Sequence, residues 1–309
     1  MLNYVFLIVG FALLIKGADF FVDGSASVAK KLRVPTMIIG LTIVAMGTSA
    51  PECAVSIAAS LKGSNTMAIS NVVGSNIFNL MVVCGACAVF TPLAVKENTM
   101  KQEFPLSILA AAMLWVMGNQ SMSIGRVDGV ILLLVFAVFL AWMVFEAKKA
   151  RGSAQEEELV PLKGWQCVVY ITVGIGAIIA GGEFVVDSAS AIAKDFGLSP
   201  TLIGLTVVAF GTSLPELVTS LVAARKGETD MALGNVIGSN IFNILLVLGV
   251  AGAVSPMEVL MENLIDDIIL IGMSSIVWVF AWRRKQISRI HGALMLAMYA
   301  GYTAYICMR

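Results

Sequence analysis

The chain has 309 residues, of which 59% are hydrophobic and 13% are charged. An ordinary soluble domain is about 45–50% apolar and about 25% charged. The composition therefore excludes an ordinary soluble globular protein. The 20 basic and 20 acidic residues give a formal net charge of zero, which excludes the basic surface of a nucleic-acid-binding protein.

Apolar stretches long enough to cross about 30 Å of hydrocarbon recur along the whole chain. We therefore predict an all-α polytopic membrane protein. The first stretch has no basic residue before it and no small-residue cleavage site, so we interpret it as a spanning helix and not as a signal peptide. The ten predicted transmembrane helices cover residues 3–29, 36–61, 66–91, 103–118, 127–146, 164–191, 200–224, 230–254, 263–282 and 290–308.

The longest connection, residues 147–163, contains several basic residues and the run Glu156, Glu157, Glu158. Such a segment cannot bury a core, so we predict a flexible tether. It divides the chain into a first repeat of five helices at 1–146 and a second repeat of five at 164–309.

The basic residues predict the orientation of these helices. If the N-terminus lies outside, 15 Lys and Arg residues fall on the cytoplasmic side and 4 on the opposite side, while Lys16 lies within the first span. Cytoplasmic loops carry such an excess, so both termini are predicted to lie outside and the 147–163 linker in the cytoplasm. Because five is odd, the second repeat enters the membrane from the opposite face. Inverted repeats with interrupted helices are typical of secondary transporters.

Two motifs occur once in each half, at a constant offset of 164 residues. Residues 40–52 recur at 204–216 with ten of thirteen positions identical, and residues 71–79 recur at 235–243 with eight of nine identical. Each motif places polar or helix-breaking residues inside apolar sequence, which a simple spanning helix does not need.

Pro51 and Pro215 predict breaks in the second and seventh helices. Proline lacks an N–H, and its ring collides with the carbonyl four residues earlier. Glu52 and Glu216 then begin the next half-helix, where the positive end of the helix dipole favours an anion.

Hydroxyl and amide side chains accompany the two glutamates. A spacing of four residues places two side chains on one helix face, and it relates Thr48 to Glu52, Ser75 to Asn79, Thr212 to Glu216, and Ser239 to Asn243. Hard oxygen ligands of this kind suit Ca²⁺, Mg²⁺ or Na⁺, not zinc or copper. Two glutamates balance one divalent cation, and six or more oxygens without rigid geometry favour Ca²⁺.

Helix packing is the alternative explanation for these features, because prolines and small polar residues also occur between packed helices. A charged glutamate at mid-membrane depth costs free energy, and its presence in both copies favours an ion path.

Four further acidic residues obey the same offset, with Asp19 and Asp23 in the first span and Glu183 and Asp187 in the sixth. They lie toward span ends, where an ion-access role or pairing between helices would account for them. Lys16 is placed one turn before Asp19, close enough to neutralise it.

The motifs GTSAPE and GTSLPE, each followed by GSNIFN, resemble those of the sodium/calcium exchanger family, within the cation/calcium exchanger superfamily. The resemblance covers the whole chain. It implies a prokaryotic-type member without a regulatory loop, in which helices 2, 3, 7 and 8 are interrupted around a central ion site. It also implies that the first and sixth helices slide as a gating pair.

The resemblance further implies which residues bind the ions. Some members have Asp at the position of Asn243, including those that require potassium, so Asn243 implies a potassium-independent exchanger. The implied ligands are the side chains of Glu52, Glu216, Asn79, Asn243, Thr48, Ser49, Thr212, Ser213, Ser75 and Ser239, and the backbone carbonyls of Ala45 and Ala209.

The predicted function is antiport of Na⁺ against Ca²⁺ across the cell membrane by alternating access. The prediction includes no enzymatic activity, no cofactor, no nucleic acid and no obligate protein partner. Ca²⁺/H⁺ exchange on the same scaffold is the alternative, because the glutamates are able to carry protons. Inverted halves around a closed site disfavour a channel, and the remoteness of the single His291 from Ser49 and Ser213 disfavours a hydrolase.

Overall fold

The computed structural model describes residues 2–61, 65–150, 162–197 and 209–308, and these are mostly helical. In the first half the α-helices are α1 (Leu2–Leu32), α2 (Thr36–Ile39), α3 (Ala45–Thr48), α4 (Ala50–Leu61), α5 (Asn65–Phe78), α6 (Cys84–Phe90), α7 (Phe104–Ser121) and α8 (Arg126–Ala150). In the second half they are α9 (Gly164–Asp195), α11 (Ala209–Thr212), α12 (Leu214–Arg225), α13 (Thr229–Phe242), α14 (Gly249–Val254), α15 (Met261–Arg284) and α16 (Arg289–Met308).

Short π-helical segments join some of these helices without a gap. They are η1 (Gly40–Val44), η2 (Asn79–Val83) and η5 (Asn243–Leu248), while η3 (Thr99–Glu103) leads directly into α7 without joining it to an earlier helix. The third and eighth predicted helices are therefore interrupted by wide turns and not by breaks. Neither turn contains a proline, and π-helical turns are frequent at functional sites.

Six helical stretches in the described residues are long and apolar enough to cross a membrane. A seventh is the bent pair Thr36–Thr48 and Ala50–Ile57, whose two parts meet at 48°. The six are Leu2–Leu32, Ala68–Phe90, Arg126–Ala150, Gly164–Asp195, Thr229–Val254 and Met261–Arg284.

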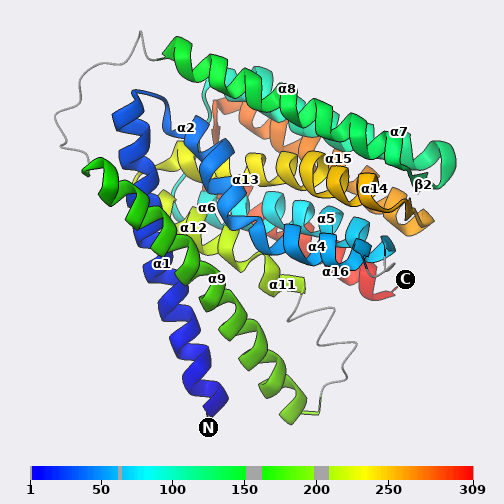
Figure 1. The fold of residues 1–309 in the computed structure, drawn as a ribbon, viewed down its shortest axis with the longest axis horizontal. Helices are drawn as coiled ribbons and strands as arrows, with labels where there is room; N and C mark the ends of the chain where they lie inside the picture. The colour runs from blue at the N-terminus through cyan, green and yellow to red at the C-terminus, as the bar shows by residue number, and fades with distance from the viewer. Residues whose placement is uncertain (1, 62–64, 151–161, 198–208, 309) are drawn as a thin grey trace.

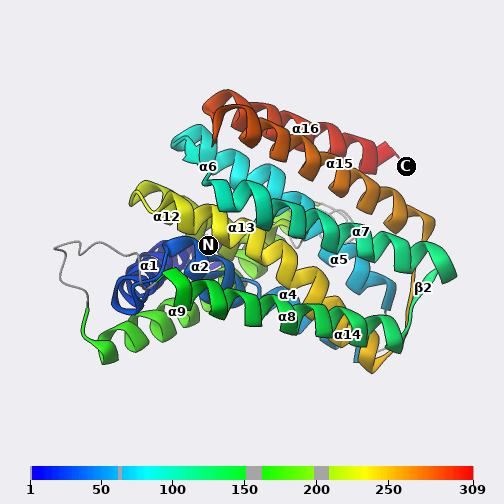
Figure 2. The same ribbon diagram turned by 90° about the horizontal axis from the view of Figure 1, so that it is seen from above.

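The two longest helices, α1 and α9, lie side by side and run at a steep angle to the other helices (Figure 1). They are antiparallel, since Gly10 meets Gly181 while Gly17 meets Gly174. A Cβ on Gly17 would lie 2.9 Å from the Gly174 carbonyl oxygen, so the two backbones pack in direct contact. Figure 2 shows α15 and α16 on the edge of the bundle opposite α9.

Two short β-ladders connect the halves at the loops. β1 (Leu93–Ala94) pairs antiparallel with β4 (Gln286–Ile287), and β2 (Ser123–Ile124) pairs antiparallel with β3 (Met257–Glu258). Each ladder joins a connection of the first half to one of the second half. The Lys96 and Asp230 side chains form an ion pair that also joins the halves.

Helix occupies each range predicted to span the membrane, as far as the described residues extend. α8 continues to Ala150, so the first four residues of the predicted 147–163 linker are helical. Residues 151–161 of that linker and residues 200–208 of the seventh predicted helix lie outside the described part of the chain.

Candidate ion-binding site

Both predicted helix breaks are present. Ser49 separates α3 from α4 with φ −82° and ψ 7°, and Ser213 separates α11 from α12 with φ −95° and ψ 7°. Glu52 and Glu216 each lie in the first turn of the helix after the break. The sequence therefore placed both carboxylates correctly at helix N-termini, where the helix dipole stabilises negative charge.

The two glutamates are linked by hydrogen bonds that cross between the halves. Ser49 Oγ donates to Glu216 Oε1 at 2.8 Å, and Ser213 Oγ donates to Glu52 Oε1 at 3.3 Å. All four side chains have no exposed surface. Two buried carboxylates from opposite halves thus meet at the two helix breaks.

Each of these carboxylates has one oxygen without a hydrogen-bond partner. Glu52 Oε2 and Glu216 Oε2 are both buried and unsatisfied, and neither glutamate forms an ion pair with any described basic residue. Burying a carboxylate without a counter-charge costs several kcal/mol. The pair therefore requires cations or protons for its neutralisation.

Neutral polar atoms without partners also come from the predicted motifs. Asn79 Oδ1 and Nδ2, Asn243 Oδ1 and Ser239 Oγ are buried and make no hydrogen bond. Asn79 and Asn243 are the first residues of η2 and η5, at equivalent positions of the two halves. Native proteins leave few such groups unpaired, so this concentration indicates a place for a ligand.

Amide side chains hold the two motif helices α5 and α13 together. Asn76 Nδ2 donates to the Asn240 carbonyl oxygen at 3.1 Å, and Asn240 Nδ2 donates to the Asn76 carbonyl oxygen at the same distance. Asn243 Nδ2 donates to Asn76 Oδ1 at 3.1 Å, which fixes the orientation of the Asn243 amide.

A second amide network lies beside the helix breaks. Asn235 Nδ2 donates to Ser220 Oγ at 2.9 Å, and Asn71 Nδ2 donates to Ser56 Oγ at 3.2 Å in the equivalent place. The Thr48 hydroxyl of the first half donates to Asn235 Oδ1 of the second half at 3.1 Å. Asn71 and Asn235 are the first residues of the two copies of the second motif, and their pairing with serines was not predicted from the sequence.

The remaining predicted ligands vary in how fully the structure describes them. The Ala45 carbonyl oxygen already accepts a hydrogen bond from the Ser49 N–H at 3.0 Å, although a carbonyl has a second lone pair. Ser75 is buried on α5, and Thr212 is half-buried. Ala209 begins α11, but its side chain lies outside the described part of the chain.

Sequence reasoning did not include Asn76, Asn240, Ser56 and Ser220 among the candidates. All four obey the offset of 164 residues, with identical residues at both positions. That repetition was the available signal for Asn76 and Asn240, which lie within the second motif. Ser56 and Ser220 lie outside both motifs, and only the fold brings them to the asparagines.

The chain matches a known protein family over nearly its whole length. The family described as sodium/calcium exchanger protein matches residues 2–145 and 167–308. The chain belongs to the sodium/calcium exchanger family. Within the described residues, no cluster of three or more His, Cys, Asp or Glu is arranged to hold a metal ion.

Relatives of this exchanger match it over nearly their full length. The putative antiporter CaxA of Alkalimonas amylolytica is 41% identical, over 96% of this chain and 96% of the relative. The sodium/calcium exchanger MaX1 of Methanosarcina acetivorans is 31% identical over 97% of each chain. A solved structure of the sodium-calcium exchanger NCX_Mj, soaked with zero Na⁺ and Ca²⁺, has a TM-score of 0.86, with 33% identity over 99% of both chains.

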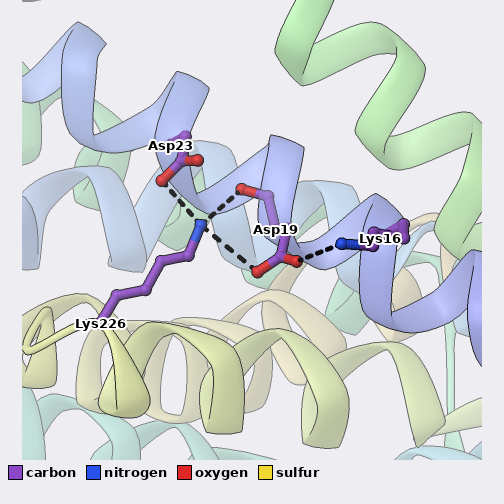
Figure 3. Close-up of polar contacts among 4 residues, drawn as sticks. All are labelled: Lys16, Asp19, Asp23 and Lys226. Atoms are coloured by element: carbon purple, nitrogen blue, oxygen red, sulfur yellow. Dashed lines mark hydrogen bonds and ion pairs between the residues drawn. The ribbon is translucent and has the colours of Figure 1, made fainter.

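Asp19 and Asp23 of the exchanger pair with a lysine that directly follows another helix (Figure 3). Lys226, at the end of α12, lies 2.7 Å from Asp23 Oδ1 and 3.4 Å from Asp19 Oδ1, and it donates to the Asp19 carbonyl oxygen at 3.1 Å. Lys16 lies 3.8 Å from Asp19 Oδ2, as its spacing had predicted. Pairing between helices therefore accounts for these two aspartates, and it links α1 to α12.

Proposed function

We propose that this exchanger is a secondary active antiporter that moves Na⁺ and Ca²⁺ in opposite directions by alternating access. The observation that carries the proposal is the buried pair of Glu52 and Glu216. The pair is cross-linked by hydroxyl groups from both halves, and each carboxylate keeps one oxygen unpaired.

The charge and the oxygen inventory favour one Ca²⁺ at this pair. Two carboxylates balance a divalent cation, and Ca²⁺ accepts six to eight oxygen ligands in flexible geometry. The same hard oxygens suit Na⁺, so the two ions compete for overlapping positions. The proposed ligands are Glu52, Glu216, Asn79, Asn243, Thr48, Ser49, Thr212, Ser213, Ser75 and Ser239, with the carbonyls of Ala45 and Ala209.

The proposed architecture is ten transmembrane helices in two inverted repeats of five, at 1–146 and 164–309. Contacts between equivalent residues support it, because Asn76 and Asn240 exchange identical hydrogen bonds. The antiparallel packing of α1 against α9 is the relation expected for the first helices of two inverted repeats.

Alternating access follows from the charge of the site. An empty site holds two negative charges, whereas bound cations balance that charge. We propose that α1 and α9 slide past the site only when it is occupied. MaX1 and NCX_Mj bear the name of sodium/calcium exchanger, which supports Na⁺ as the coupling ion. Asn243 supplies no third carboxylate, so we propose that potassium is not required.

Exchange of Ca²⁺ for protons is the second candidate. The same observation supports it, because two buried carboxylates without a basic partner are neutralised equally well by protons. In either case we propose a location in the cell membrane, with both termini outside and the 147–163 linker in the cytoplasm.

The two candidates are distinguished by Ca²⁺ uptake into proteoliposomes that contain the purified protein. An outward Na⁺ gradient, with K⁺ and pH equal on both sides, is expected to drive uptake. An outward proton gradient without Na⁺ is expected to drive none. Uptake driven by the proton gradient alone would replace Na⁺ with H⁺ as the coupling ion.

A further inference from the structure

A second buried acid lies away from the two glutamates. Asp267 is in α15, six residues after the first residue of that helix, or about 9 Å along it. Its side chain is 2% exposed, and neither carboxyl oxygen has a hydrogen-bond partner. No described basic residue forms an ion pair with it.

Asp267 faces a small cavity between α15, α5 and α7. The cavity has a volume of about 10 Å³, enough for the centre of one water molecule. Its lining is apolar except for Asp267 and Asn263, and it consists of Ile69, Val73, Leu114, Gly118, Val259, Asn263, Leu264 and Asp267. This site has room for one small species and few groups to hold it.

The Asn263 amide is already engaged in other hydrogen bonds. Its Oδ1 accepts from the Leu260 N–H at 3.0 Å, and its Nδ2 donates to Ser70 Oγ at 2.8 Å. Asp267 is thus the one group lining the cavity whose polar side-chain atoms lack partners. Its two oxygens and one water do not make the coordination shell of Ca²⁺, which takes six to eight oxygens.

Among the described residues, other charges are poorly placed to neutralise Asp267. The packed helices α5 and α7 contain no titratable residue. At its own end of α15 the titratable neighbours along the chain are acidic, namely Glu258, Glu262 and Asp266. The other segments packed on α15 are η3, β4 and α16. The Trp278 N–H donates to the Met100 carbonyl oxygen and Phe280 stacks on His291, so η3 and the start of α16 contact α15 near its C-terminal end. These segments carry Lys101, Glu103, Arg289, His291, Tyr299, Tyr302, Tyr305 and Cys307.

We propose that the Asp267 carboxyl is a proton-binding site, separate from the ion site, in which the neutral acid donates its hydrogen to a water in this cavity. One proton from solvent adds to the carboxylate, and nothing else is consumed or released. The neutral acid allows α15 to pack on α5 without a buried charge. Because α5 carries Ser75 and leads into Asn79, the proton stabilises the helix that presents two of the proposed ligands.

Infrared spectroscopy of the purified protein tests this directly, since protonated and ionised carboxyls absorb at different frequencies. Asp267→Asn replaces the acid with a neutral group of the same shape. The spectrum of the native protein minus that of Asp267→Asn is expected to contain a protonated carboxyl band at neutral pH. The control Glu262→Gln removes an exposed carboxylate of the same helix and is expected to leave that band unchanged. A difference spectrum with only ionised-carboxylate bands would overturn the proposal.

Two more measurements do not depend on that difference spectrum. Native protein labelled with ¹³C at the aspartate carboxyls is expected to show a shifted protonated-acid band, which separates aspartate from Glu52 and Glu216. If no protonated-acid band shifts, the proposal fails. Unfolding would also release the bound proton at any pH between about 3.9, the pKa of a solvent-exposed aspartate, and the pH at which the folded carboxyl ionises. In that window stability falls as pH rises, by about tenfold in the unfolding equilibrium per pH unit. Asp267→Asn lacks this term, and parallel melting curves against pH for the two proteins would contradict the proposal.

Discussion

Replacing Glu52 with glutamine removes one charge from the proposed ion site with little change in shape. The introduced amide would keep an oxygen that accepts the Ser213 hydroxyl, now 3.3 Å from Glu52 Oε1. Glu52 has no exposed surface, so solvent does not screen the lost charge. Removing one member of a buried charge pair costs about 3–5 kcal/mol, and each 1.4 kcal/mol changes an equilibrium about tenfold. We therefore expect Ca²⁺ affinity to fall between about a hundredfold and several thousandfold.

The assay is Ca²⁺ uptake by proteoliposomes as a function of Ca²⁺ concentration, with folding checked by gel filtration and thermal melting. Glu97→Gln is the matched control. Glu97 is exposed in the connection between the predicted spans 66–91 and 103–118. Its hydrogen bond with Lys101 holds its pKa below the ordinary value, so this variant also removes one negative charge. We expect native transport from Glu97→Gln and none at ordinary Ca²⁺ concentrations from Glu52→Gln or Glu216→Gln. Near-native exchange by a folded Glu52→Gln protein would exclude Glu52 from the ion site.

Three other predictions concern topology, selectivity and the α1–α12 link. Single cysteines introduced in the 147–163 linker, on a cysteine-free background, should react with a membrane-impermeant thiol reagent only from the cytoplasmic side. A cysteine in place of Glu258 should react only from outside. Labelling of both positions from the same side would exclude inverted repeats. Asn243→Asp adds a third carboxylate, so Ca²⁺ flux should become steeper in pH or newly sensitive to K⁺, and curves identical to those of the native protein would remove Asn243 from the site. Lys226→Met breaks a partly exposed ion pair, so exchange at saturating ions should change by less than about fivefold; abolished exchange by the folded variant would contradict this.

The sequence was sufficient to predict the features that arise locally. Pro51 and Pro215 predicted the helix breaks, because a proline disrupts a helix wherever it occurs in its interior. The two glutamates followed from their position after the prolines. The repeat offset predicted that both halves would contribute, since each motif occurs twice.

Features that depend on contacts between the halves were not predictable in this way. Spacing paired Thr48 with Glu52 on one helix face, whereas the structure pairs Ser49 with Glu216, 167 residues away. The link from Lys226 to Asp23 crosses 203 residues. The π-helical turns at Asn79 and Asn243 have no distinctive residue, because they arise where packing shifts a helix by one residue.

The sequence alone does not distinguish Asp267 from its neighbour Asp266. Asp266 and Asp267 lie inside a predicted span, and charged residues there are expected to be functional or paired. Only the packing distinguishes them, because the cavity and the unpaired oxygens belong to Asp267.

Equilibrium binding of radiolabelled Ca²⁺ to the purified protein shows whether Glu52 and Glu216 together bind the ion. We predict one Ca²⁺ per chain, displaced by added Na⁺, and no specific binding by the folded Glu52→Gln, Glu216→Gln double variant. Unchanged Ca²⁺ binding by that double variant, or Ca²⁺ binding that Na⁺ does not displace, would contradict this prediction.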